Sequence, residues 1–297
     1  MNNFIDYFYN IKVDNITNKG NYYMFIYNKY IYKLYIYDGN DNIDFLVNIN
    51  KQMLGRTLVS EIILNKDGSA ISLYNGIAYI LIKVYVSQEK NISLEDISFL
   101  SNSLQINKMA PNWGLMWSKK IDYLEDLINE NGKKYPIIVN SFNYFVGMAE
   151  NAISYFNSIQ TSKNYTCFVN HKIIRFSDRS DVLYNPLNII FDYKVRDVAE
   201  YIKNAFFLNN RNIFKELRRY LNYNNLSLID VRLLISRVLY PSFYFELYED
   251  ILIDHKSEKI IVPIIGRMPE YEKYIATVIN FFRQWYDIDH VMWLTRN

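Results

Sequence analysis

The sequence predicts an α+β protein in which a small β-rich lobe, residues 1–90, precedes a larger helical lobe, residues 91–297. In the first lobe, β-branched and aromatic residues form short runs between polar turns, the pattern of β-strands. From Ser93 onward, apolar residues recur every three or four positions, which is typical of helices. Half of the 297 residues are hydrophobic, so the chain has ample material for a buried core.

Five strands and one helix are expected in the β-rich lobe. The strands are Tyr22–Tyr27, Tyr30–Tyr37, Glu61–Asn65, Ser69–Tyr74 and Ile77–Val86. Asn75-Gly76 supplies the positive φ angles of a type I′ turn and therefore predicts a hairpin. The apolar residues within Asp41–Leu54 follow helical spacing, and Gly55 suits the end of that helix. The expected order is two strands, one helix and three strands.

The second lobe is expected to be mostly helical. Ser93, followed by Glu95 and Asp96, has the composition of a helix start. Ser141–Ile159 is apolar nearly all round, which predicts a central, buried helix. Extended segments are expected at Tyr165–Arg175 and Val182–Phe191. The other predicted helices are Trp117–Ile128, Asp197–Phe207, Ile213–Leu221, Ser227–Tyr240, Ser242–Ile253 and Tyr271–Tyr286.

Composition excludes several classes of function. With 33 basic and 31 acidic residues, the net charge of +2 gives no reason to expect a nucleic-acid partner. The single Cys167 excludes an internal disulfide and any metal site built from several cysteines. The chain begins without a secretory signal and contains no uncharged apolar run of about eighteen residues, so a cytoplasmic protein without a membrane partner is expected. The basic clusters Lys215–Arg219 and Arg232–Arg237 are interpreted as solvated helix faces.

The helical lobe carries a resemblance to a known family. Asn140–Phe156 (NSFNYFVGMAENAISYF) and Trp117–Ile128 (WSKKIDYLEDLI) resemble the spore-coat-associated, kinase-like proteins of Gram-positive bacteria. Phe191–Lys203, Tyr240–Leu252 and Asp289–Leu294 also resemble that family. Its members belong to the aminoglycoside-phosphotransferase-like superfamily. The resemblance implies a two-lobed protein-kinase-like fold, with one helix in a small β-rich N-lobe and a larger helical C-lobe.

An active member of that superfamily needs a lysine on the phosphates and a helix glutamate that orients it. Lys33, in the strand YIYKLYIY, resembles the phosphate lysine, and an exposed strand lysine is the equal alternative. The helix Asp41–Leu54 contains no glutamate. Asp44 is the acid in its first turns, and its side chain is one methylene shorter than glutamate.

The catalytic and metal positions also depart from the family pattern. His171 resembles the catalytic-loop histidine, and we expect it to be a core residue whose ring nitrogens brace that loop. Ile173 stands where the catalytic aspartate belongs and cannot accept a proton. When Asp197 is aligned as the N-cap of the next helix, Asn188 falls at the magnesium position. Asparagine offers Mg²⁺ one neutral oxygen, a weaker ligand than a carboxylate. Asp192 is either a substitute ligand or a turn residue.

The sequence therefore favours a pseudokinase with a structural or partner-binding role and no catalytic residues. Any remaining cofactor contacts are assigned to Lys33, Asn188 and Asp192, although no cofactor is expected. An unidentified protein partner would dock on the aromatic helical lobe; the aromatic segment Pro241–Tyr248 is either core or part of such a patch. If the host sporulates, the resemblance implies association with the spore coat.

Two alternatives remain. In the first, the chain is a divergent ATP-dependent small-molecule phosphotransferase that uses magnesium. Asp178, Asp181 or Asp192 would then have taken over the acidic roles, with Lys33 on the phosphates. In the second, the chain binds nucleotide without magnesium and without transfer, as a folding switch.

Overall fold

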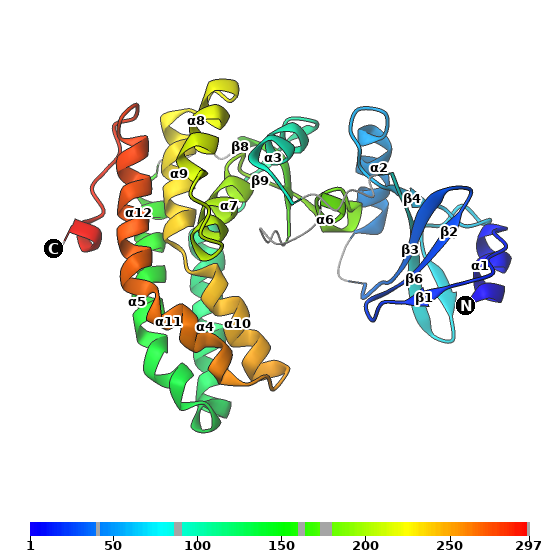
Figure 1. Ribbon diagram of the computed structural model, residues 1–297, viewed down its shortest axis with the longest axis horizontal. Helices are drawn as coiled ribbons and strands as arrows, with labels where there is room; N and C mark the ends of the chain where they lie inside the picture. Colours follow the sequence, from blue (N-terminus) through cyan, green and yellow to red (C-terminus); the bar gives the residue numbers. More distant parts are fainter. Residues whose placement is uncertain (40–41, 86–90, 160–163, 173–179, 296–297) are drawn as a thin grey trace. The chain divides into compact units, whose positions relative to one another are not determined.

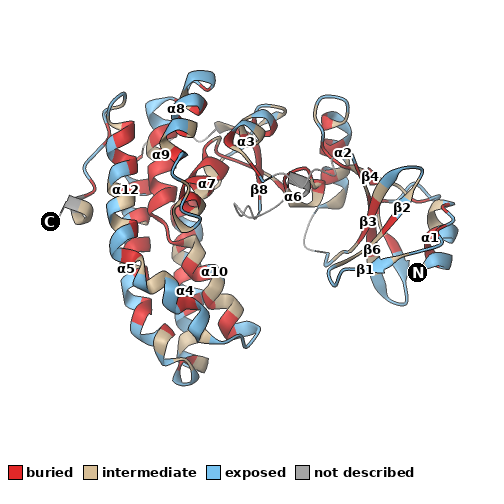
Figure 2. Ribbon diagram, viewed as in Figure 1, coloured by how far each residue is buried: buried red, intermediate tan, exposed pale blue. Residues whose placement is uncertain are grey.

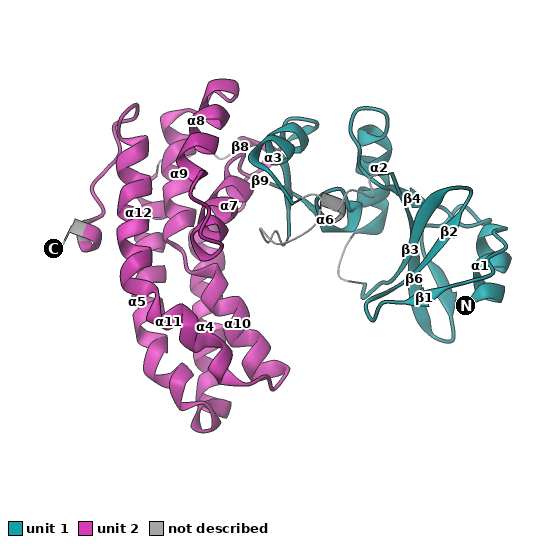
Figure 3. Ribbon diagram, in the orientation of Figure 1, with its two compact units in different colours: residues 1–106, 168–191 teal, residues 107–167, 192–297 magenta. Residues whose placement is uncertain are grey.

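A computed structural model describes the chain except for residues 40–41, 86–90, 160–163, 173–179 and 296–297 (Figure 1). It divides into two compact units, shown in Figure 3. The first comprises residues 1–106 and 168–191, and the second comprises residues 107–167 and 192–297. The lobe boundary at residue 90 stays a prediction. Among the described helices, none combines the length and the apolar character needed to cross a membrane.

The first unit is built on an antiparallel sheet that, in the described residues, has six strands. The strands follow the order β1-β2-β3-β6-β4, and β5 pairs with β6. Their bounds are Thr17–Asn18 (β1), Tyr22–Tyr27 (β2), Tyr30–Ile36 (β3), Glu61–Ile63 (β4), Ser72–Tyr74 (β5) and Ile77–Val84 (β6). All five predicted strands are therefore present, and β1 is an addition.

Two of the hairpin turns use positive backbone φ angles. Asn75 and Gly76 have φ angles of 50° and 76°, which confirms the predicted hairpin between β5 and β6. Asn28 and Lys29 join β2 to β3 with φ angles of 47° and 68°. Two central residues with positive φ match the right-handed twist of the strands they connect, which is why this turn suits tight hairpins.

Helices cover both faces of the central strand β6. Tyr79 and Leu81 belong to one buried cluster, whereas the alternate residues Ile80 and Ile82 belong to another. Successive strand residues point to opposite faces, so the two clusters lie on opposite sides of the sheet. This double burial explains why IAYILIKV is almost continuously apolar rather than alternating.

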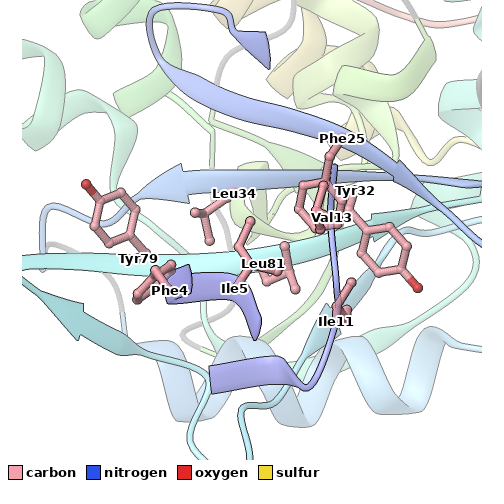
Figure 4. Close-up of a cluster of buried hydrophobic side chains, with 9 residues drawn as sticks. All are labelled: Phe4, Ile5, Ile11, Val13, Phe25, Tyr32, Leu34, Tyr79 and Leu81. Atoms are coloured by element: carbon pink, nitrogen blue, oxygen red, sulfur yellow. The ribbon is translucent and has the colours of Figure 1, made fainter. Parts of the chain in front are cut away.

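The first cluster is completed by a helix that the sequence did not predict, α1 (Asn2–Tyr9). Figure 4 shows Phe4 and Ile5 of this helix against Leu34 and Leu81 of the sheet. The helix has only eight residues, and its polar residues conceal the apolar stripe that faces the sheet. The second cluster is completed by Leu46 of α2 (Ile43–Met53), the predicted helix.

The predicted start of the next helix is confirmed in full. Ser93 is the N-cap of α3 (Leu94–Ser101), and its hydroxyl accepts a 3.2 Å hydrogen bond from the Asp96 amide. The Asp96 carboxylate in turn accepts a 3.1 Å bond from the Ser93 amide. This reciprocal capping box satisfies two amides that the helix itself leaves unpaired.

The second unit is helical, and every helix predicted for it is present. Its helices are α4 (Trp113–Asn131), α5 (Pro136–Asn157), α7 (Arg196–Phe207), α8 (Ile213–Tyr223), α9 (Leu228–Leu239), α10 (Ser242–Ile253), α11 (Val262–Gly266) and α12 (Met268–Phe282). Short 3₁₀ turns lie at Gly132–Lys134, Glu258–Ile261 and Met292–Thr295. Helix α5 packs against α4 and α9, and α9 also contacts α7 and α12.

Burial along α5 differs from the prediction that this helix is buried all round. Phe142, Phe145 and Met148 are buried, but Asn140 and Tyr144 are exposed. Figure 2 shows buried and exposed segments along the same helix. Helix α5 is therefore amphipathic: its asparagines and Tyr144 are exposed, whereas Tyr155 is buried.

A second sheet has the strand order β7-β8-β9. Its strands are β7 (Gln105–Met109), β8 (Asn164–His171) and β9 (Ile189–Asp192). The extended segment predicted from Tyr165 corresponds to β8. The segment predicted at Val182–Phe191 is only partly extended, because it includes the end of α6 (Ser180–Leu183) and the 3₁₀ turn Pro186–Asn188 (η2).

Aromatic side chains fill the interior of the second unit. Tyr244 and Tyr248 are fully buried, as is Phe245, so the aromatic segment near Pro241 is core. The Trp117 and Tyr240 rings stack with their centres 4.4 Å apart. Such pairs add to the stabilisation that burial provides.

Candidate nucleotide site

Lys33, the predicted phosphate lysine, lies in the middle of β3. It pairs with Met24 of β2 and Ile82 of β6. Only 9% of the residue is exposed, so the alternative of an exposed strand lysine is wrong. Its ammonium lies 4.9 Å from the centre of the Tyr22 ring, within cation–π range. A role on phosphate stays a prediction.

The helix that would carry an orienting glutamate presents an amide to the sheet instead. Asn50 of α2 is buried, and its side-chain N–H donates a 2.7 Å bond to the Ser60 carbonyl. Its side-chain oxygen accepts a 2.9 Å bond from the Ile62 amide. Ile62 pairs with Ile82, which is also the strand partner of Lys33. Asn50 therefore binds the backbone of β4, which is two strands away from Lys33 in the sheet. Asp44, the acid of this helix, is exposed.

Replacing Asn50 by alanine is expected to destabilise the first unit by about 2 kcal/mol, because a buried carbonyl and a buried amide would lose their partner. Chemical denaturation followed by circular dichroism measures this change. Asn48→Ala, at an exposed position of the same helix, is the matched control. Equal stability of the two variants would show that the two backbone bonds of Asn50 contribute nothing.

The catalytic-loop region is only partly within the described residues. His171 ends β8, is 1% exposed, and its Nε2 lies 2.8 Å from the Leu183 carbonyl oxygen. This contact ties β8 to α6, as expected for a histidine that braces the loop. Ile173 and Asp178 lie outside the described residues, and so does the side chain of Asp181.

Asn188 ends the 3₁₀ turn η2, directly before β9. Its carbonyl oxygen accepts a 2.9 Å bond from the Lys172 amide. The Lys172 ammonium donates a 2.8 Å bond to the neighbouring Leu187 carbonyl. The backbone at this position is thus fixed to the end of β8, and its assignment as the magnesium position stays a prediction.

Asp192 is a buried carboxylate with three partners in the second unit. Trp113 Nε1 donates to both carboxylate oxygens, at 3.1 and 3.2 Å. The Tyr193 amide donates to Oδ1 at 2.7 Å, and the Arg196 guanidinium donates to Oδ2 at 2.8 Å. Asp192 is 3% exposed. Its negative charge is therefore balanced by an adjacent cation, and both oxygens already accept hydrogen bonds.

The alignment that put Asn188 at the metal position used Asp197 as a helix cap, and this cap is wrong. Helix α7 begins at Arg196, Val195 occupies the N-cap, and no side chain caps the helix. Asp197 is the second helical residue and is 1% exposed. A carboxylate in the first turn is still favourable there, because it lies at the positive end of the helix dipole.

Next to this region lies a buried ion network that the sequence did not predict. The Glu200 carboxylate of α7 accepts bonds from the Lys203 ammonium at 2.9 Å and from the Arg237 Nε at 2.8 Å. Lys203 is 1% exposed and Arg237 is 7% exposed, so the interpretation of Arg232–Arg237 as a solvated face is wrong for Arg237. Lys203 also donates 2.6 Å to the Ser242 hydroxyl.

One carboxylate between two cations explains the pKa shifts in this network. Burial by itself would raise the pKa of Glu200, but Lys203 and Arg237 outweigh it and lower that pKa to about 2. Burial lowers the pKa of Lys203 to about 8, since Lys203 shares its carboxylate partner with a second cation, Arg237. Burial also lowers the pKa of Arg237.

Trp113 joins this network to Asp192. Its indole N–H binds the Asp192 carboxylate, and its ring centre lies 4.9 Å from the Arg237 guanidinium carbon. The local signal for the network was a glutamate and a lysine three residues apart on α7. Arg237 comes from α9, so only tertiary packing places it there. Within the described ranges, no three His, Cys, Asp or Glu residues form a group that could hold a metal ion.

Comparison with known proteins decides the family. The sequence profile described as "Spore coat putative kinase YutH" matches residues 2–273. The chain belongs to this family. The endospore coat-associated protein YutH of Bacillus subtilis (strain 168) is 27% identical over 271 residues, which cover 80% of this chain and 79% of that protein. The resemblance seen in the helical lobe is thus confirmed.

Solved structures confirm the fold of this YutH-family chain. An aminoglycoside phosphotransferase from Alicyclobacillus acidocaldarius has a TM-score of 0.65 and 9% identity, over 92% of each chain. Spectinomycin phosphotransferase APH(9)-Ia, solved with ADP and spectinomycin, has a TM-score of 0.60 and 9% identity, over 99% of this chain and 95% of its own. The chain therefore has the predicted kinase-like α+β fold, with an antiparallel sheet in the N-lobe and a larger helical part.

Proposed function

We propose that this YutH-family chain is a catalytically degenerate, kinase-like protein that acts in the spore coat by binding a protein partner. The observation that carries the proposal is the state of Asp192, the acid nearest in sequence to the predicted magnesium position. Its two oxygens accept bonds from Trp113, Tyr193 and Arg196. These contacts support a structural role for the Asp192 carboxylate within the second unit.

Recruiting Asp192 to a metal would break those contacts. Mg²⁺ requires near-octahedral oxygen coordination and is usually held by one or two carboxylates together with the phosphates. If Asp192 turned to a metal, the largely buried Arg196 and the buried indole of Trp113 would lose the Asp192 carboxylate as an acceptor. Removing one partner from a buried ion pair costs about 3–5 kcal/mol. With Asn188 neutral, the donor set of these residues does not fit Mg²⁺.

The helix of the N-lobe supports the same conclusion. The lysine–glutamate pair of an active kinase orients the lysine on the phosphates. Here the polar residue that α2 directs at the sheet is Asn50, and both ends of its amide bind backbone. A buried amide in that role stabilises the lobe but carries no charge to orient Lys33.

The spore coat enters the proposal through the relative's name and the family's description. The Bacillus subtilis relative is called an endospore coat-associated protein, and the family carries the description "Spore coat putative kinase YutH". A chain that no longer transfers phosphate can still be part of the spore coat if it binds another coat protein. We therefore expect a protein partner, no nucleic-acid partner and no need for ATP or magnesium.

Thermal unfolding of the pure protein with ATP, with and without Mg²⁺, tests the loss of catalysis. We expect no magnesium-dependent rise in Tm, whereas a ligand at a hundred times its Kd would stabilise the protein by about 2.7 kcal/mol. A parallel assay with γ-labelled ATP and a panel of sugars, amines and alcohols should transfer no phosphate.

Lys33→Met and the exposed Lys29→Met form the matched pair of variants for this experiment. A magnesium-dependent rise in Tm that Lys33→Met abolishes and Lys29→Met retains would favour the divergent phosphotransferase, as would any labelled product. A rise that persists in chelator and is lost only in Lys33→Met would instead indicate magnesium-independent nucleotide binding.

A further inference from the structure

The second unit contains a cavity that none of the site residues lines. It has a volume of about 500 Å³ and lies among α5, α11 and α12. Its apolar wall includes Phe145 of α5, Ile265 of α11 and Met268 of α12. Cavities of roughly 300–1,000 Å³ with mostly apolar walls and a few polar groups are typical small-molecule sites.

The cavity lies far along α5 from the Trp113 and Asp192 pair of the same unit. Ser141, near the N-terminal end of the helix, lines the cavity. Phe156, near the C-terminal end, packs on Trp113, the partner of Asp192, with ring centres 5.9 Å apart. Fifteen residues of helix span about 22 Å. The cavity is thus a separate feature of the helical unit.

Among the described residues that line the cavity, the charged group is the Glu272 carboxylate. The Glu272 carboxylate accepts a 2.5 Å hydrogen bond from the Tyr144 hydroxyl, and both residues line the cavity. Burial, and then the hydrogen bond from Tyr144 to Glu272, raise the pKa of Tyr144, so the phenol stays protonated. Among the described residues, no lysine or arginine lines the cavity, and none forms an ion pair with Glu272.

Two further contacts limit what else the cavity could hold. The amides of Ile137 and Ile138, at the start of α5, donate to the Glu258 carboxylate at 2.9 and 3.4 Å. The N-terminal end of α5, which could attract an anionic ligand, is therefore already occupied by the Glu258 carboxylate. The Ser141 hydroxyl contacts the Tyr244 hydroxyl and donates to the Ile137 carbonyl, both at 2.8 Å. The remaining polar groups are Asn140 and the Glu272 carboxylate.

We infer that this cavity binds an amphipathic amine, whose apolar body fills the space beside Phe145, Ile265 and Met268 and whose protonated amino group pairs with Glu272. Apolar walls favour the body of such a ligand because its burial removes apolar surface from water. The carboxylate selects the cation because a charge-assisted hydrogen bond is about twice as strong as a neutral one. An anionic analogue would face Glu272 with like charge.

Calorimetric titration with three probes of one shape tests the inference: 2-(1-naphthyl)ethylamine, 2-(1-naphthyl)ethanol and 1-naphthylacetate. We expect the amine to bind best and the carboxylate worst. Glu272→Gln should weaken binding of the amine about tenfold, the effect of losing one charge-assisted contact, and leave the alcohol almost unchanged. Glu150→Gln, at an exposed position of α5, is the matched control and should change neither.

Two variants that block the space complete the test. Ile265→Trp fills the cavity with a larger side chain, and Asn140→Trp narrows it from an exposed position. If Ile265→Trp disturbs the fold, the variant at the exposed position still tests the cavity. Both should abolish binding of amine and alcohol alike. Equal binding of the three probes, no binding by any of them, or binding that survives Asn140→Trp would overturn the inference. None of these outcomes depends on phosphoryl transfer.

Discussion

Glu200→Gln is expected to lower the free energy of unfolding at pH 7 by about 3–5 kcal/mol, the usual cost of removing one partner from a buried ion pair. The variant would leave Lys203 and Arg237 without their common carboxylate. Urea denaturation of the variant and the native protein measures the difference. Glu125→Gln, at an exposed position of α4, changes the charge in the same way and should have almost no effect.

The lowered pKa of Glu200 also predicts how the free energy of unfolding depends on pH in acid solution. The pKa of Glu200 is about 2 in the folded protein and 4.5 in its ordinary state. Because the folded pKa is depressed, this stabilisation is present above pH 4.5 and is lost as the pH falls toward 2. It corresponds to about 3 kcal/mol. Glu200→Gln should therefore flatten the stability profile between these pH values.

Lys203 makes an unfavourable contribution at neutral pH, which is relieved at alkaline pH. Its pKa is about 8 in the folded protein against an ordinary 10.5, so the unfolded chain binds more protons between these values. This contribution makes stability rise as the pH rises from 8 to 10.5. The double variant Glu200→Gln with Lys203→Met should recover part of the loss caused by Glu200→Gln alone, because it removes the uncompensated ammonium. A double variant less stable than the single one would contradict this account of the network.

Asp192→Ala is expected to be as damaging, by about 3–5 kcal/mol, because the largely buried Arg196 and the buried indole of Trp113 would lose the Asp192 carboxylate as an acceptor. The structural role also predicts that this loss is the same with and without ATP and Mg²⁺. Denaturant titrations under both conditions measure it. The control is Asp126→Ala, at an exposed position of α4.

The comparison with and without ATP and Mg²⁺ distinguishes a structural Asp192 from an Asp192 that binds magnesium. If Asp192 held magnesium, the native protein would gain stability from ATP and Mg²⁺, and Asp192→Ala would not. A variant whose stability stays near that of the native protein in the absence of ligand would contradict the structural role directly. The effects of Asp192→Ala and Glu200→Gln should not be additive, because Trp113 contacts both Asp192 and Arg237.

The site residues show how far local sequence could lead. His171 was expected to brace its loop, and its bond to Leu183 agrees with that role. The lack of a glutamate in α2 was visible directly, but Asn50 was not singled out, because its two bonds reach the backbone of Ser60 and Ile62, ten and twelve residues away. Asp192 was an open choice between ligand and turn residue. Trp113 and Asp192 are 79 residues apart, and no local pattern relates them.

Local sequence was enough to predict five strands of the first sheet, the type I′ turn at Asn75 and Gly76, the start of α3 and most of the helices of the second unit. These features depend on neighbours within a few positions: alternating side chains, positive φ angles at Asn75 and Gly76, and the capping pair Ser93 and Asp96. Three features became visible only in the folded chain: the helix α1, the exposed face of α5, and the position of Glu200 between two cations. Each of these needs groups from distant segments, and their contact free energy exists only once the chain has folded.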